Sequence, residues 1–194
     1  MKAAVRARLF SAATRTAKRE VRRVEHLNEP EDILRMRSAL ALAAEAARDG
    51  DVPIGAALIV GNQTFLARNE KERRPDPTAH AEILALRSAA AALGRWRLVD
   101  ATLFVTKEPC VMCAGAIVAA RIARLVFGCR DPKGGAAGSV IDVFGSVAAN
   151  HHVNVIAGVL EAEAAQQLAD FFAARRAVRR ERLTGEGAGR RNVL

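Results

Sequence analysis

Residues 101–120 read ATLFVTKEPCVMCAGAIVAA and join a strand pattern to a helix pattern with two residues between them. Residues 101–106 are β-branched, aromatic or aliphatic, which is typical of a buried strand. Pro109 suits the first position of a helix because its fixed φ is already helical, and the apolar residues after it continue that helix. Cys110 and Cys113 are three positions apart, so both thiols lie on one face of the first turn, where the helix dipole favours thiolates.

A second segment with chemical potential, His80-Ala81-Glu82, opens another expected helix, which runs from Thr78 to a stop at Gly94. One imidazole and two thiolates around Zn²⁺ leave the fourth tetrahedral position for water, whose pKa falls to about 7 there. Glu82 is poorly placed to share the ion with His80, but it can move a proton of that water. The spacing predicts a catalytic zinc site with His80, Cys110 and Cys113 as ligands and Glu82 as general acid and base.

Each motif alone has a plainer interpretation. A lone C-x-x-C is as often a redox pair, and a structural zinc site would need a fourth Cys or His at regular spacing. Cys129, the remaining cysteine, lies in the apolar segment 125–129 and is expected to be a core residue. The conjunction of H-x-E with P-C-x-x-C, 30 residues apart, is the signature of the zinc nucleobase deaminases, so we favour the catalytic interpretation.

Outward from these segments, helix and strand patterns alternate along the chain. Apolar residues recur at helical spacing from Pro30 to a stop at Gly50, and strands are expected at 54–60 and 64–68 around a short Gly61-Asn62 turn. Two later strands and a long final helix are expected at 125–129, 153–156 and 161–182. The order α-β-β-α-β-α-β-β-α predicts one α/β domain in which helices cover both faces of a mixed sheet.

The positive charge of the chain is concentrated at its two ends. The 194 residues carry a net charge of +9, and segments 1–24 and 171–194 hold more than that sum, so the remainder is acidic. Basic ends suit a polyanion such as nucleic acid, although they can also serve solubility alone. We therefore divide the chain into a basic extension (1–29), a deaminase domain (30–183) and a flexible tail (184–194).

Composition also bears on the compartment. No apolar run is long enough to cross a membrane, and an odd number of cysteines with one C-x-x-C argues against a secreted disulfide framework. The first residues are rich in Arg, Ser and Ala, which is also the composition of an organelle transit peptide. We expect a cytoplasmic protein, or an organellar one if this segment is a transit peptide.

The sequence resembles the bacterial tRNA-specific adenosine deaminases of the cytidine deaminase superfamily over about residues 33–182. The resemblance is carried by segments 76–83 (DPTAHAEI), 96–128, 130–131, 135–139 and 170–172. It implies a three-layer α/β/α sandwich with a five-stranded mixed sheet, one Zn²⁺ per subunit, and a homodimer whose site borrows from the neighbouring subunit. The implied reaction converts adenosine to inosine at the wobble position of a tRNA anticodon loop.

The same resemblance suggests the residues that would contact RNA. It implies that Asn69 contacts the substrate, that Val52 lines an apolar pocket, that Asp131 contacts the neighbouring nucleotide and that Phe172 binds the loop. The backbone N–H of Ala81 is expected to help orient the base. Four arginines of the last helix are expected to contact phosphates: Arg175, Arg176, Arg179 and Arg180. Segment 70–74, Cys129, Pro132 and Gly134 depart from the family pattern, which bears on how the RNA loop is held.

Two other function classes stay open at this point. The first is a small-molecule deaminase of the same fold, acting on guanine, cytidine or a riboflavin precursor, because the metal motif is common to all of them. The second is a zinc-stabilised RNA-binding subunit without activity of its own, against which the presence of Glu82 argues. Three further residues have plain interpretations: Trp96 is expected to pack against other residues, and His151-His152 to lie in a loop.

Overall fold

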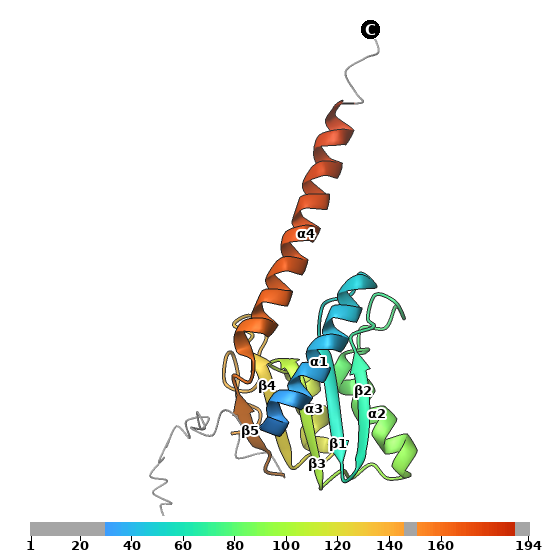
Figure 1. The fold of residues 1–194 in the computed structure, drawn as a ribbon, viewed down its shortest axis with the longest axis vertical. Coiled ribbons are helices and arrows are strands. Elements are labelled where there is room, and N and C mark those ends of the chain that lie inside the picture. Colours follow the sequence, from blue (N-terminus) through green and yellow to red (C-terminus); the bar gives the residue numbers. More distant parts are fainter. Residues whose placement is uncertain (1–29, 146–150, 189–194) are drawn as a thin grey trace, which may run out of the picture.

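A computed structural model describes residues 30–145 and 151–188 of the chain. It contains a five-stranded sheet in the order β2-β1-β3-β4-β5, flanked by helices (Figure 1). The elements are α1 (Pro30–Arg48), β1 (Gly55–Val60), β2 (Gln63–Arg68), α2 (Ala81–Leu93), β3 (Ala101–Lys107), α3 (Val111–Ala119), β4 (Arg124–Cys129), β5 (Asn154–Ala157) and α4 (Glu161–Ala188). Their order is the one that the sequence predicts.

The sheet is mixed because its strands are joined in two different ways. β1 and β2 form an antiparallel hairpin whose short turn contains Gly61 at a φ of 55°, a left-handed conformation that glycine adopts without strain. β3 pairs antiparallel with β1, whereas β3, β4 and β5 are mutually parallel. Helix α3 makes the crossover between β3 and β4, as a parallel connection requires. This confirms the expected five-stranded mixed sheet.

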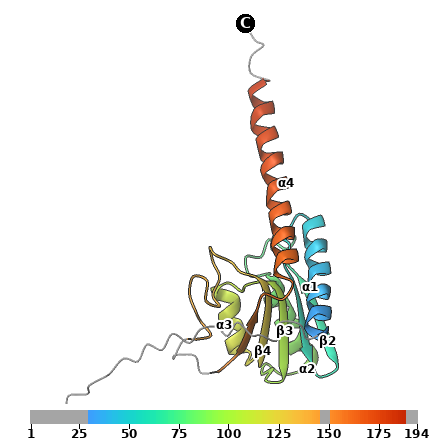
Figure 2. The same ribbon diagram turned by 60° about the vertical axis from the view of Figure 1, so that its left-hand side comes forward.

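Helices cover both faces of the sheet (Figure 2). One apolar core joins α2 and α3 to the sheet, and a second joins α1 and α4 to its other face. Helix α1 lies so close to β1 that a Cβ on Gly55 would be 2.0 Å from the carbonyl oxygen of Ala39, so only glycine fits there. The three-layer α/β/α architecture is therefore confirmed.

Three expected helix limits were wrong. Helix α2 begins at Ala81 rather than at Thr78, since His80 is its N-cap. Pro109 lies before α3 rather than at its first position, because Cys110 is the N-cap and the helix begins at Val111. Helix α4 continues to Ala188, so residues 184–188, expected in a flexible tail, are helical. Each glycine in that segment costs a helix about 1 kcal/mol, which weakens a helix without ending it. The expected basic extension, residues 1–29, lies outside the described residues.

The topology brings several chain segments to one edge of the sheet. The carboxyl ends of the parallel strands β3, β4 and β5 meet there, together with the start of β1 and the end of β2. Helix α4 follows β5 and projects far from the body at this same end (Figure 1). In the part of the chain that the structure describes, no helix is long and apolar enough to span a membrane.

Candidate active site

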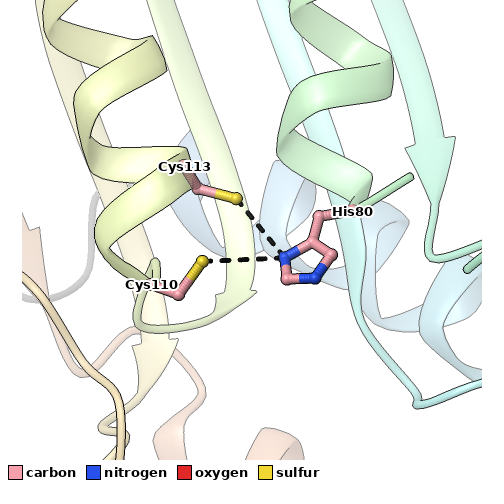
Figure 3. A group of neighbouring side chains, drawn as sticks. All are labelled: His80, Cys110 and Cys113. Atoms are coloured by element: carbon pink, nitrogen blue, oxygen red, sulfur yellow. Dashed lines mark hydrogen bonds between the residues drawn. The ribbon is translucent and has the colours of Figure 1, made fainter. Parts of the chain in front are cut away.

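Two helix N-termini converge at this edge of the sheet and bring together three side chains that could hold a metal ion (Figure 3). His80 is the N-cap of α2 and Cys110 is the N-cap of α3, and neither side chain caps its own helix. Instead, Nδ1 of His80 lies 3.7 Å from Sγ of Cys110 and 3.5 Å from Sγ of Cys113. The three residues that the motifs single out therefore form one cluster.

The cluster fits a metal ion. Zn–S bonds of about 2.3 Å and Zn–N bonds of about 2.0–2.1 Å at a tetrahedral angle separate N from S by about 3.5 Å, close to the separations observed. Among residues 30–145 and 151–188, one group of three or more His, Cys, Asp or Glu residues has ligand atoms close enough together to share an ion. Its members are His80, Cys110 and Cys113. Three protein donors of this kind leave a tetrahedral position free, which is the arrangement of catalytic sites.

The ionisation of the cluster shows how strongly its members interact. Hydrogen bonds from Cys113 and His80 lower the pKa of the Cys110 thiol to about 3. The hydrogen bond with Cys110 and burial raise the pKa of Cys113, and the hydrogen bond with Cys110 raises that of His80. The cluster thus holds one thiolate readily, and a bound cation would supply the positive charge that a second thiolate needs.

Glu82 lies in the first turn of α2, two residues after His80. Its side chain is only 3% exposed, and burial raises the pKa of its carboxyl group. Among the described residues, its Oε2 atom has no hydrogen-bond partner. A buried carboxylate oxygen without a partner is costly, so its persistence points to a partner that the protein chain itself does not supply.

A second buried polar atom without a partner belongs to Asn69, which directly follows β2. Asn69 is 3% exposed, and its Oδ1 has no hydrogen-bond partner in the described part of the chain. The next residue, Glu70, donates its backbone N–H to the carbonyl oxygen of Ala79, which precedes His80. The structure therefore places Asn69 on the segment that runs beside the metal cluster.

A loop of residues 130–139 forms another wall beside Cys110, and Glu108 holds it there. The Glu108 carboxylate, buried between β3 and α3, accepts the backbone N–H groups of Asp131 (3.0 Å), Ala137 (2.9 Å) and Ser139 (3.1 Å) and the Ser139 hydroxyl. Gly135 bridges to Cys110, and a Cβ there would lie 2.4 Å from the Glu108 side chain. The loop is therefore anchored directly next to Cys110, one of the three candidate metal ligands.

Asp131, one of the expected substrate contacts, lies in this loop. Its carboxylate pairs with Lys107 (Oδ2–Nζ 2.7 Å) and accepts the N–H of Lys133 (3.1 Å). Burial opposes its ionisation, but these two donors outweigh burial and hold the pKa of Asp131 below its ordinary value. Asp131 therefore carries a negative charge that is already engaged with a lysine.

The remaining expected contacts are placed differently. Val52 is half-buried next to Asp51, and Ala81 is fully buried as the first residue of α2. Phe172 lies on α4, on the opposite face of the sheet from α2 and α3, and is 42% exposed beside Phe171. The metal cluster and Phe172 are thus carried by different layers.

Sequence reasoning was correct for two plain interpretations and wrong for a third. Cys129 is buried in the core between β4 and α4, and His151 and His152 lie in a loop, where a ring nitrogen of His151 contacts the carbonyl oxygen of Ile122 at 2.8 Å. Trp96, expected to pack, is 59% exposed in the connection between α2 and β3. The expectation failed because an aromatic side chain indicates burial only on average, and the connection passes over the surface.

Two residues of the site escaped the sequence reasoning altogether, Asp51 and Glu108. Asp51 precedes Val52 and Glu108 precedes Pro109, and both lie in connecting segments, where an acidic side chain is usually exposed to solvent. Their burial becomes visible only when the loops that they bind are folded around them. A sequence signal did exist for Glu108, since it directly precedes the Pro109-Cys110 motif.

Comparisons with known proteins agree with this geometry. The family model of the MafB19-like deaminases matches residues 31–176. The tRNA-specific adenosine deaminase of Haemophilus influenzae is 47% identical over 143 residues (73% of this chain and 83% of that protein). The tRNA-specific adenosine deaminase of Bacillus subtilis is 44% identical over 143 residues (73% and 89%).

Solved structures give the same result. A structure from a study of A-to-I editing by tRNA:A34 deaminases at the wobble position of transfer RNA superposes with a TM-score of 0.68 at 43% identity, covering 70% of this chain and 99% of that one. A guanine deaminase from Nitrosomonas europaea superposes with a TM-score of 0.64 at only 26% identity, covering 73% and 84%. With the cluster, the fold and these relatives in agreement, the chain belongs to the family of the tRNA-specific adenosine deaminases.

Proposed function

We propose that this protein is a zinc-dependent hydrolase that deaminates adenosine to inosine at the wobble position of a tRNA anticodon. The observation that carries the proposal is the cluster of His80, Cys110 and Cys113, together with the buried carboxyl group of Glu82, which is two residues after His80. Two relatives that are 44% and 47% identical to this chain over 143 residues are tRNA-specific adenosine deaminases by name.

The residues divide the chemistry between them. His80, Cys110 and Cys113 would hold one Zn²⁺ per subunit, and the ion supplies Lewis acidity and lowers the pKa of a bound water. Glu82 takes the proton of the attacking water and delivers it to N1 of adenine. It then passes a second proton to the leaving amine as C6 becomes a carbonyl carbon. The unpartnered Oε2 of Glu82 supports this role, because this buried oxygen is engaged by no group of the described residues and is therefore available to the water and the substrate.

The site suits a base that is already unpaired. An anticodon loop presents its bases without a complementary strand, so little energy is needed to move one into a pocket. Asn69, Val52 and the backbone N–H of Ala81 would then contact the base, and Asp131 the adjacent nucleotide. Their positions on segments around one edge of the sheet support this assignment.

Helix α4 would bind the phosphate backbone beside the loop. Its surface carries Phe172, Arg175, Arg176, Arg179 and Arg182 around a groove of about 620 Å³ that also reaches the end of α1. Helix α4 projects from the body (Figure 2), at the edge of the sheet where α2 and α3 begin, so an RNA in the site would extend along it. Phe172 would stack on a base, and the guanidinium groups would neutralise phosphates.

Substitution of Arg175, Arg176 and Arg179 by Gln should weaken tRNA binding most at low salt. Each lost phosphate contact reduces the magnitude of the negative slope of log K against log salt concentration by about 0.7–0.9. The slope of the triple variant should therefore be less steep by about 2–3. Fluorescence anisotropy with an anticodon stem-loop at several salt concentrations measures it. Arg95→Gln, at the opposite end of the sheet, is the control, and an unchanged slope in the triple variant would contradict the role of α4.

We also propose that the protein acts as a homodimer through the face formed by α2 and α3. This face has an apolar groove of about 310 Å³ with the exposed Trp96 at its rim and Leu86, Ala90, Ala116 and Ala119 along it. A groove of this composition suits a second copy of the chain. We place the protein in the cytoplasm, because an odd number of cysteines with one C-x-x-C argues against a secreted disulfide framework.

A charge placed in the groove should separate the two copies. Ala119→Arg is expected to shift the particle from dimer to monomer at micromolar concentration, measured by sedimentation or light scattering. The control is Ala91→Arg. Ala91 is exposed, as Ala119 is, but it lies on α2 outside the groove. A monomeric wild-type protein, or a dimer that survives Ala119→Arg, would contradict the proposed interface.

The substrate itself is tested by incubating the purified protein with bulk tRNA and sequencing for A-to-G changes at anticodons. Free adenosine, cytidine and guanine are assayed in parallel. Deamination at the first anticodon position, without turnover of the free compounds, is the expected result. The structural likeness to a guanine deaminase makes a small-molecule enzyme the second candidate, and turnover of a free base alone would establish it instead.

A further inference from the structure

Asp51, in the connection between α1 and β1, is a buried charge that the reaction described above does not use. Its side chain is 1% exposed. Its Oδ1 accepts the side-chain Nδ2 of Asn69 (2.9 Å) and the backbone N–H of Val52 (2.9 Å), and its Oδ2 accepts the backbone N–H of Glu72 (2.8 Å). One carboxylate therefore connects two segments around the candidate site, the α1–β1 connection and the connection that follows β2.

The bond to Asn69 determines which way the Asn69 amide points. An ionised carboxylate only accepts hydrogen bonds, so the amide nitrogen of Asn69 must face Asp51. The flipped amide would place its oxygen against a carboxylate oxygen at the same distance, with repulsion in place of a bond. With the nitrogen fixed, Oδ1 of Asn69 is held away from Asp51, where it is buried and without a partner among the described residues.

The backbone of Asn69 is fixed as firmly as its side chain. Its N–H donates to the carbonyl oxygen of Ile54 (2.9 Å), and the N–H of Glu70 donates to the carbonyl oxygen of Ala79 (3.0 Å), next to His80. The unpartnered oxygen therefore cannot rotate toward water without breaking the bond to Asp51. A buried acceptor in that state favours a ligand that brings an N–H or O–H donor.

We propose that Asp51 is a positioning residue that orients the Asn69 amide so that its oxygen accepts a hydrogen bond from a donor group of the bound nucleoside. The inference rests on the proposed function, which supplies the nucleoside. The donor is an exocyclic amino group or a ribose hydroxyl, which share this chemistry. Asp51 itself touches no substrate and acts through Asn69.

A reciprocal exchange of the two side chains tests this role, because Asp and Asn have the same shape. Asp51→Asn frees the Asn69 amide to flip, and Asn69→Asp places two carboxylates in contact, so each should lower kcat/KM on an anticodon stem-loop about tenfold or more. The double exchange restores an amide donor facing a carboxylate and keeps an acceptor oxygen at position 69, but it gives up the Val52 N–H bond, because Oδ1 of Asp51 accepts both Val52 and Asn69. It should recover at least tenfold over Asn69→Asp alone.

Asp32→Asn is the matched control, since Asp32 is also a buried carboxylate but binds Arg124 away from the site. It should leave kcat/KM within about twofold. The inference would be overturned by a double variant whose kcat/KM is no higher than that of Asn69→Asp, or by an Asp51→Asn variant as active as the wild type. If Asp51→Asn fails to fold, the comparison of Asn69→Asp with the double variant is the deciding test. A wild type inactive on the stem-loop would instead overturn the proposed function, and the inference with it.

Discussion

Glu82→Gln is expected to lower kcat for tRNA deamination by about 10³-fold while the protein keeps its fold and its metal. General acid and base catalysis by a positioned carboxylate contributes about 10²–10⁴ in rate, and Glu82 is proposed to move both protons of this reaction. The amide has nearly the same shape, so it fills the same buried space in the first turn of α2. Single-turnover assays with excess enzyme measure the rate of the chemical step.

The controls for this prediction separate chemistry from binding. The stem-loop should bind Glu82→Gln about as tightly as the wild type, because the RNA contacts proposed on α4 are untouched. Glu70→Gln changes another carboxylate, which pairs with Arg73 and Arg74, and it should keep activity within about twofold. If Glu82→Gln retains most of the wild-type rate, both enzymatic interpretations fail and a non-catalytic RNA-binding protein becomes the better account.

Cys113→Ala is expected to remove the bound metal and to reduce activity at least 10³-fold. Two donors hold an ion far more weakly than three, and the fully buried Cys113 thiol has no neighbour in the sequence that could replace it. Elemental analysis should find one zinc per chain in the wild type and close to none in the variant. Dialysis of the wild type against a chelator should reproduce the loss, and added Zn²⁺ should restore activity.

Cys129→Ala is the matched control for that experiment, because it makes the same chemical change at another buried cysteine. Cys129 packs in the core between β4 and α4, so its loss should cost about 1 kcal/mol of stability and leave the zinc content at one per chain. Equal loss of zinc in both variants would mean that the ion depends on overall stability rather than on the proposed ligands. Zinc retained in Cys113→Ala would remove this residue from the metal site.

The sequence was most informative where function depends on local spacing. The helix and strand order follows from apolar periodicity, and the Cys110–Cys113 pair is three residues apart on one chain segment. His80 could be joined to that pair because H-x-E and P-C-x-x-C together form the signature of the zinc nucleobase deaminases. The same logic could not place Asp51 or Glu108, whose roles depend on backbone N–H groups 21 to 31 residues away.

Other differences have equally physical causes. Glycines suggested that the last helix ends at 182, but a long helix tolerates them and α4 reaches Ala188. Pro109 suggested the first helical position, yet Cys110 occupies the N-cap, and this leaves its thiol free to face His80. The exposed Trp96 shows that a residue on the surface can look like a core residue in the sequence.

Anomalous X-ray diffraction at the zinc absorption edge, from crystals grown without chelator, tests the central claim most directly. We predict one strong peak among Nδ1 of His80, Sγ of Cys110 and Sγ of Cys113, bound to these three protein atoms and to no fourth. A map without a peak there, or an ion that a fourth side chain closes off from solvent, would contradict the account.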